Sequence, residues 1–300
     1  MSNLNLTDTS LFISMLYLSL IANVFAAQSI DKKLSIGNDV QLQIKVQRGD
    51  VTIQTWDKNE VSVSGTLDEL SEGFIFEQQG NNLNIEDKMP RHYNSGSNTS
   101  SQLTIKVPQA VKLSVDTVSA NLQLTGIKGE LELNTVSGNI SAKAVDGKIQ
   151  FETVSGMLQD TDSQGEISYH LVSGDLTSQS RAEKVTIEQV SGEVNANLSV
   201  AKEVTLKTVS GDVQISLAKN LTKANLESVS GDIMLTFVDM PDASFDLNGG
   251  PSGKINNALT QDKPEKQKYA PRAELAFQTG SGAAKVKMNT ISGELTLKKR

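Results

Sequence analysis

The sequence predicts an all-β protein, a parallel β-solenoid with rungs of about 18–20 residues that each contain two strands and two corners. Three observations lead to this prediction. A Thr-Val-Ser-Gly phrase recurs with small variations, apolar and polar residues alternate between its copies, and helical periodicity is absent after residue 26. A fixed period near 20 residues is typical of stacked repeats, which bury their apolar side chains only against neighbouring repeats.

The copies of the phrase read TVSA, TVSG, TVSG, LVSG, QVSG, TVSG, SVSG and TISG, and the first six intervals are 18, 18, 18, 18, 19 and 20 residues. Glycine tolerates close approach of the next rung, and a serine hydroxyl can bond to nearby backbone groups. We therefore predict a structural corner at Ser137, Gly138, Ser155, Gly156, Ser173, Gly174, Ser191, Gly192, Ser210, Gly211, Ser230, Gly231, Ser292 and Gly293.

The apolar alternation changes parity at this corner. Leu131 and Leu133 precede the phrase on odd positions, whereas Ile140 and Ala142 follow it on even positions, together with Val136. A parity change means that the chain bends while its apolar side stays inward. The valine of each phrase is accordingly predicted to lie in the stacked core: Val118, Val136, Val154, Val172, Val190, Val209 and Val229.

A second parity change marks the other corner of each rung. Gly129, Gly147 and Gly165 lie at this corner in three successive units. Between the corners, apolar residues should stack in two further columns. The first is Leu113, Leu131, Ile149, Ile167, Val185, Val204 and Ala224; the second is Val115, Leu133, Phe151, Tyr169, Ile187, Leu206 and Leu226.

The chain divides into four segments. Residues 1–26 are predicted to be a secretory signal peptide, because an uncharged apolar run ends with Val24 and Ala26 at the −3 and −1 positions of a cleavage site. The segment before that run has no Lys or Arg and contains Asp8, so an uncleaved anchor helix stays open as the alternative. Either way, we expect an exported protein, located in the periplasm or at the cell surface.

The other three segments differ in regularity. Residues 27–110 contain strand-like runs and are predicted to form irregular β rungs or an N-terminal cap, since a solenoid needs its end strands covered. Residues 111–240 form the regular rungs. Residues 241–300 form irregular C-terminal rungs with a loop at 256–273, and the pattern returns in a final rung around Ser292.

The composition excludes several function classes. The net charge is −7 without a basic stripe, which argues against nucleic-acid binding. The absence of cysteine excludes disulfides, thiolate zinc sites and a Cys nucleophile. We expect no cofactor and no metal. The expected partner is a protein or a polymer of the envelope or surface, with membrane contact only through the N-terminal segment if it is not cleaved.

No catalytic residue is predicted. A Ser nucleophile needs a base within hydrogen-bonding reach, and the only histidines are His92 and His170. A role repeated in every rung cannot depend on a histidine present in one. The repeated serines are therefore interpreted as structural, and the carboxylates show no pair converging across a groove as in a glycoside hydrolase.

Two other patterns have functional alternatives. The residue after the corner glycine is often acidic, as in Asp175, Asp212 and Asp232, and stacked carboxylates could share Ca²⁺. Asn139 occupies the same position in an earlier rung, and a solvated corner explains the same residues. The Arg-Gly-Asp sequence at residues 48–50 precedes a strand-like run and is interpreted as a turn rather than a receptor motif.

The order of early strands, a Val107-Pro108 pair and successive Val-Ser-Gly rungs resembles the bacterial putative-adhesin family, over roughly residues 35–300. The resemblance implies a solenoid-like fold outside the cytoplasm and an adhesive or envelope-associated role, and it supplies no catalytic residue. We therefore predict an exported, non-catalytic protein with an adhesive, scaffolding or binding role at the cell envelope. A carbohydrate-active β-helix enzyme and an envelope-stress sensing component remain the alternatives.

Overall fold

A computed structural model describes residues 28–37, 39–91, 99–266 and 272–300. Within these ranges the chain forms 25 strands of one hydrogen-bonded, mostly parallel sheet, and no helix occurs. The predicted all-β class is thus confirmed. The proposed signal peptide and His92 lie outside the described residues.

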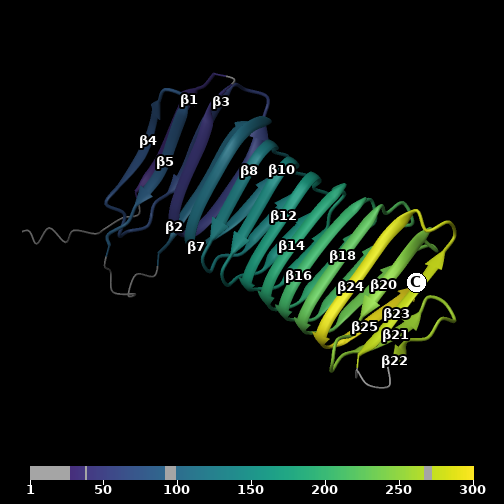
Figure 1. Cartoon of the computed structure of the whole chain (residues 1–300). Coiled ribbons are helices and arrows are strands. Elements are labelled where there is room, and N and C mark those ends of the chain that lie inside the picture. Colours follow the sequence, from purple (N-terminus) through teal and green to yellow (C-terminus); the bar gives the residue numbers. More distant parts are fainter. Residues whose placement is uncertain (1–27, 38, 92–98, 267–271) are drawn as a thin grey trace, which may run out of the picture.

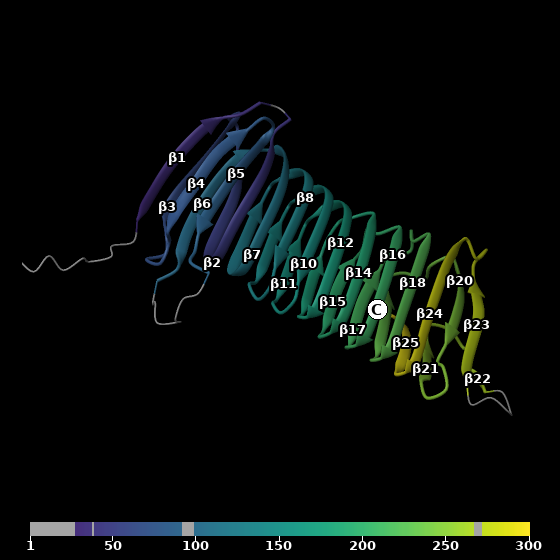
Figure 2. The same cartoon turned by 60° about the vertical axis from the view of Figure 1, so that its left-hand side comes forward.

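The middle of the chain forms two series of parallel strands stacked along one axis (Figure 1 and Figure 2). One strand of each series, with its connections, makes what we call a rung. The long strand β7 (Ala110–Thr125) pairs with the first strand of both series. The first series is β8 (Lys128–Thr135), β10 (Asp146–Thr153), β12 (Gln164–Ser173), β14 (Lys184–Ser191), β16 (Glu203–Ser210) and β18 (Lys223–Ser230). The second series is β9 (Ile140–Lys143), β11 (Leu158–Thr161), β13 (Leu176–Gln179), β15 (Val194–Leu198), β17 (Val213–Leu217) and β19 (Ile233–Phe237).

The register places equivalent residues of successive rungs beside each other. Ile149 is paired with Leu131 on one side and Ile167 on the other, and Phe151 is paired with Leu133 and Tyr169. All six side chains are buried. The two core columns predicted from the alternation are therefore confirmed, because period-2 alternation leaves only these positions facing the interior.

The N-terminal part adds a rung that the repeat pattern did not reveal. Strand β2 (Gln41–Trp56) runs parallel to β7, pairing Arg48 with Ser119 and Gly49 with Ala120. The Arg-Gly-Asp sequence is thus the corner of this first rung and lies within a strand. The remaining strands form the end of the stack, with both parallel and antiparallel pairs: β1 (Ser29–Ser35), β3 (Glu60–Thr66), β4 (Gly73–Gln79), β5 (Asn82–Lys88) and β6 (Ser101–Pro108).

The C-terminal rungs stack in an order that differs from the sequence order. Strands β24 (Ala284–Ser292) and β25 (Glu294–Lys299) pair directly with β18 and β19. The earlier strands β20 (Ala243–Asn248) and β21 (Lys254–Ala258) pair on their far side. Antiparallel strands β23 (Ala273–Thr279) and β22 (Glu265–Lys266) follow. The rung around Ser292 is therefore last in sequence but not last in the stack.

The predicted inward position of the corner valines is wrong. Val118, Val136, Val154, Val172, Val190, Val209 and Val229 are all exposed, at 43–48%. The strand alternation continues one residue further than predicted, so that Thr135 faces inward and Val136 and Ser137 both face outward before Gly138 is buried again. The parity change thus falls after the valine, and a buried column of mostly small polar residues takes the predicted place: Thr117, Thr135, Thr153, Leu171, Gln189, Thr208, Ser228 and Thr290.

Candidate functional site

The displaced valines line a long surface groove. It follows the corner across the stack from β7 through β24 to β20, whose last residue Asn248 also lines it, and it has a volume of about 1240 Å³. One side is a row of exposed β-branched residues, which we call the valine stripe. The stripe consists of Val118, Val136, Val154, Val172, Val190, Val209, Val229 and Ile291, of which all but Val118 line the groove.

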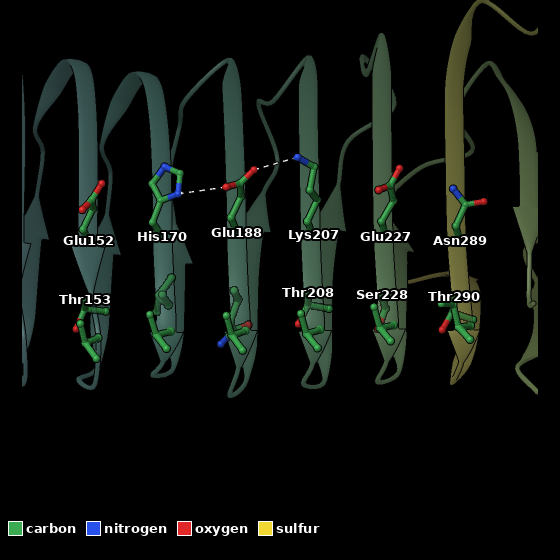
Figure 3. Close-up of a pocket in the computed structure, with 18 of the residues that line it drawn as sticks. Glu152, Thr153, His170, Glu188, Lys207, Thr208, Glu227, Ser228, Asn289 and Thr290 are labelled. Carbon is green, nitrogen blue, oxygen red and sulfur yellow. Dashed lines mark hydrogen bonds and ion pairs between the residues drawn. The ribbon is translucent and has the colours of Figure 1, made fainter.

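Polar residues two positions before the valines form the other side of the groove. These residues, the outer ladder, are paired from rung to rung and project toward solvent (Figure 3). They are Asp116, Asn134, Glu152, His170, Glu188, Lys207, Glu227 and Asn289. The groove therefore has an apolar side and a polar side that run parallel along the stack.

Carboxylates outnumber lysines on the outer ladder. Glu188 is the carboxylate of the ladder with two basic side chains at close range: its Oε1 lies 3.1 Å from Lys207 Nζ and its Oε2 lies 3.5 Å from His170 Nδ1. The hydrogen bond from Lys207 lowers the pKa of the Glu188 carboxyl below its ordinary value. Glu152 and Glu227 accept hydrogen bonds from Gln150 and Asn225, and no cation of the described chain forms an ion pair with either.

The conformation of the corner is fixed by its small residues. A Cβ on Gly156 would lie 2.3 Å from the Gly138 carbonyl oxygen of the preceding rung, so close approach requires glycine. The Ser137 hydroxyl donates to the Val118 carbonyl at 3.2 Å, and Thr135 Oγ1 accepts from the Gly138 N–H at 3.0 Å. These contacts support a structural role for the corner serines and glycines. They bring no base to a serine hydroxyl.

The acidic side chains beside the corner accept hydrogen bonds from the backbone of the next rung. Asp175 Oδ1 accepts from the Glu193 N–H at 2.9 Å, and Asp232 Oδ1 accepts from the Glu294 N–H at 2.7 Å. Asn139 accepts from the Met157 N–H in the same way. Each side chain thus bonds to the next rung, and an amide does so as well as a carboxylate. Among the described residues, no three His, Asp or Glu side chains cluster as a metal site would require.

The Arg-Gly-Asp corner is held by hydrogen bonds to the N-terminal part of the chain and to the next rung. The Arg48 guanidinium makes two hydrogen bonds to the buried carboxylate of Asp68, one of them 2.9 Å long from Nη2. Asp50 accepts from Asn121 at 2.8 Å and from Gln102 at 2.6 Å, and these bonds lower the pKa of its carboxyl. Both charged side chains are therefore occupied within the fold.

Sequence reasoning did not find the groove. The sequence alone suggests only a catalytic base at His170, and its equivalents in the other rungs are mostly polar or charged. The signal that could have revealed the groove is the combination of a polar residue, a threonine and a valine before the corner. If the threonine faces inward, the two flanking residues face outward on the same side.

Comparison with known proteins identifies the family. A family model described as Toastrack DUF4097 matches residues 40–298, and the chain belongs to this family. No curated protein matches the chain. Within the described part of the chain, no helix has the length and apolar character needed to cross a membrane.

Several solved structures are similar to this chain at low identity. A putative lipid binding protein from Parabacteroides distasonis has 17% identity and a TM-score of 0.51, with 89% of this chain and 96% of that chain covered. A putative adhesin from Bacteroides fragilis has 10% identity and a TM-score of 0.47, with coverages of 92% and 98%. A putative adhesin from Parabacteroides merdae has 15% identity and a TM-score of 0.45, with coverages of 91% and 96%. At these identities, the Parabacteroides distasonis protein indicates a shared fold alone.

Proposed function

We propose that this protein is an exported, non-catalytic β-solenoid that binds a protein or a surface polymer at a bacterial cell envelope, in an adhesive or scaffolding role. The observation that carries the proposal is the groove, in which seven stacked rungs expose equivalent apolar residues beside a polar ladder. Contiguous exposed apolar residues rimmed by polar ones are typical of interaction sites.

The groove chemistry favours binding over hydrolysis. A glycoside hydrolase needs two carboxyl groups about 5–10 Å apart on opposite sides of the scissile bond. In this groove the carboxylates lie along one side, and the opposite side is the valine stripe. A carbohydrate-active enzyme or a component of envelope-stress sensing remains the alternative. The proposed rungs of 18–20 residues, with two strands and two corners each, provide the long lateral face that a binding role requires.

Photocrosslinking in the native cell, followed by fractionation, tests this proposal. A photoreactive residue at Val190 places the probe in the groove, and the same residue at Val238, exposed outside the groove, is the control. We expect a covalent partner at Val190 in an envelope or surface fraction and none at Val238. Identical capture at the two positions, or a cytoplasmic location, would contradict the proposal.

A further inference from the structure

We propose that the groove binds an amphipathic α-helix with basic residues along one flank, laid parallel to the stack. This inference rests on the proposed binding role and specifies the chemistry of the partner. The apolar face of the helix contacts the valine stripe, and its lysines or arginines face the carboxylates of the outer ladder.

The size of the groove fits one face of a helix. Nine rungs, from β7 to β20, spaced about 4.8 Å apart span about 38 Å, so a volume of about 1240 Å³ corresponds to a mean cross-section of about 32 Å². A helix with its side chains is about 10–12 Å in diameter. The groove therefore accepts less than half of a helix, which is the part that carries an apolar stripe.

The spacing of the groove also fits a helix. Apolar residues of an amphipathic helix recur every three or four positions, which at 1.5 Å per residue gives about 5.3 Å between successive contacts. The valines recur at about 4.8 Å, so apolar side chains of the helix can lie between successive valines over several turns. Glu152 and Glu188 are two rungs apart, about 10 Å, close to the rise of one heptad.

Backbone hydrogen bonding favours a helix over an extended peptide. The Ser155 N–H donates to the Val136 carbonyl at 2.8 Å, and the Ser173 N–H donates to the Val154 carbonyl at 2.7 Å. The backbone beside the stripe is thus already paired from rung to rung. An extended peptide lying across the rungs would find few partners for its own N–H and C=O groups, whereas a helix satisfies these groups internally.

Charge complementarity determines the sign of the partner's charge. The outer ladder has four carboxylates, Asp116, Glu152, Glu188 and Glu227, and a single lysine, Lys207. Arg272 also lines the groove, where it pairs with Glu274. Neither Glu152 nor Glu227 forms an ion pair with a cation of the described chain, and Lys207, the register neighbour of Glu227, pairs with Glu188 instead. The whole chain has a net charge of −7, which also attracts a basic partner over longer distances. Apolar contact on one side and carboxylates on the other therefore select a basic amphipathic helix.

Fluorescence anisotropy with designed peptides and the full chain tests the inference. The probe is a labelled 21-residue peptide of three heptads, with apolar residues on one face and a lysine on its flank in each heptad. Two matched peptides replace the lysines with glutamate or place a proline in the middle. We expect the lysine helix to bind at least about tenfold more tightly than either. Equal binding of the proline peptide would overturn a helical partner.

Variants of the chain assign the binding to the groove. The double variant Val172→Gln with Val190→Gln should weaken binding about tenfold or more, because it makes the apolar side polar without changing the charge. The control is Val238→Gln. Glu152→Lys with Glu227→Lys should also weaken binding, whereas Glu72→Lys with Glu77→Lys, at exposed sites away from the groove, should not. Binding that responds only to total charge would overturn the inference.

The outcomes separate this inference from the binding role itself. If Val190 captures a partner in cells but no lysine helix binds, the binding role stands and the helical chemistry is wrong. Stronger, valine-dependent binding of neutral phospholipid vesicles would also contradict the helix and indicate a lipid. If Val190 captures no partner in cells and no lysine helix binds, both proposals are wrong.

Discussion

The Tyr169 hydroxyl donates a 2.5 Å hydrogen bond to Asp160 Oδ2 inside the stack, where both side chains are fully buried. Asp160 also accepts from Ser163, and Ser178 Oγ lies 3.0 Å from the phenol oxygen. The ring of Tyr169 stacks on Phe151 of the preceding rung, with centroids 5.6 Å apart. A buried carboxyl group and the buried Ser178 paired with it thus interrupt a mostly apolar column, and Asp160 forms no ion pair with a described cation.

This carboxylate predicts a pH dependence of stability. Burial raises the pKa of Asp160 above its ordinary value of 3.8, so the folded chain binds the proton more readily than the unfolded chain. The stabilisation that this proton provides is present in full below the pKa of Asp160 in the unfolded chain. It is lost as the pH rises through the higher pKa of Asp160 in the folded chain. Urea unfolding of the natural chain and of Asp160→Asn, at a series of pH values from below 3.8 upward, isolates the contribution of Asp160. We expect the natural chain to lose stability relative to the variant as pH rises; a constant difference would contradict it.

Removing the phenol hydroxyl should destabilise the same region. Tyr169→Phe keeps the ring, whose size is accepted in the same column at Phe151, but leaves the Asp160 carboxylate with fewer donors. We expect a loss of about 1–3 kcal/mol in the free energy of unfolding. A double-mutant cycle with Asp160→Ala, which removes the acceptor, measures the coupling. Additive effects of the two substitutions would show that the hydrogen bond contributes nothing.

The exposed valines predict a contrast between equivalent substitutions. Val154→Thr lies on the valine stripe and should change the free energy of unfolding by no more than about 0.5 kcal/mol. Val204→Thr places the same hydroxyl in a buried column and should cost about 1–3 kcal/mol. Thermal and urea unfolding of the two variants provide the comparison. An equal cost would mean that the stripe is buried in solution.

This contrast also marks how far the sequence could predict the structure. The 18-residue interval and the alternation around Leu131 and Phe151 were sufficient for the parallel register, because stacking is the one way to bury such a pattern. They were not sufficient at the corner. A threonine and a valine side by side are both β-branched, and parity alone does not say which of them precedes the bend.

The repeat pattern could not predict features that depend on contacts between distant parts of the chain. The first rung carries Arg-Gly-Asp in place of the repeated phrase, and only its pairing with Ser119–Asn121 identifies it as a corner. The stacking order of the last rungs depends on which strand edge is free, a property of the folded chain. The groove escaped prediction for a related reason, since it exists only once the valines face outward.

The acidic column predicts a small and specific effect that does not depend on calcium. Asp212 Oδ1 accepts from the Asp232 N–H at 3.3 Å across the rungs. Asp212→Asn retains an acceptor, as Asn139 does naturally, and should be nearly neutral, whereas Asp212→Ala should cost about 0.5–1.5 kcal/mol. Addition of calcium or of a chelator should leave the unfolding midpoint unchanged. A calcium-dependent rise that Asp212→Ala abolishes would instead indicate a metal site.

Replacing a corner glycine with alanine adds a single methyl group and should lower the free energy of unfolding strongly. In Gly156→Ala, the added Cβ would lie 2.3 Å from the Gly138 carbonyl oxygen, a backbone atom that cannot move without shifting the neighbouring rung. Gly37→Ala is the matched control, because its Cβ meets nothing within 4 Å. We expect Gly156→Ala to lower the free energy of unfolding by more than about 2 kcal/mol, by the same steric mechanism as overpacking a core. Gly37→Ala should be neutral or slightly stabilising. Equal unfolding midpoints for the two variants would show that successive rungs are further apart at the corner than their pairing requires.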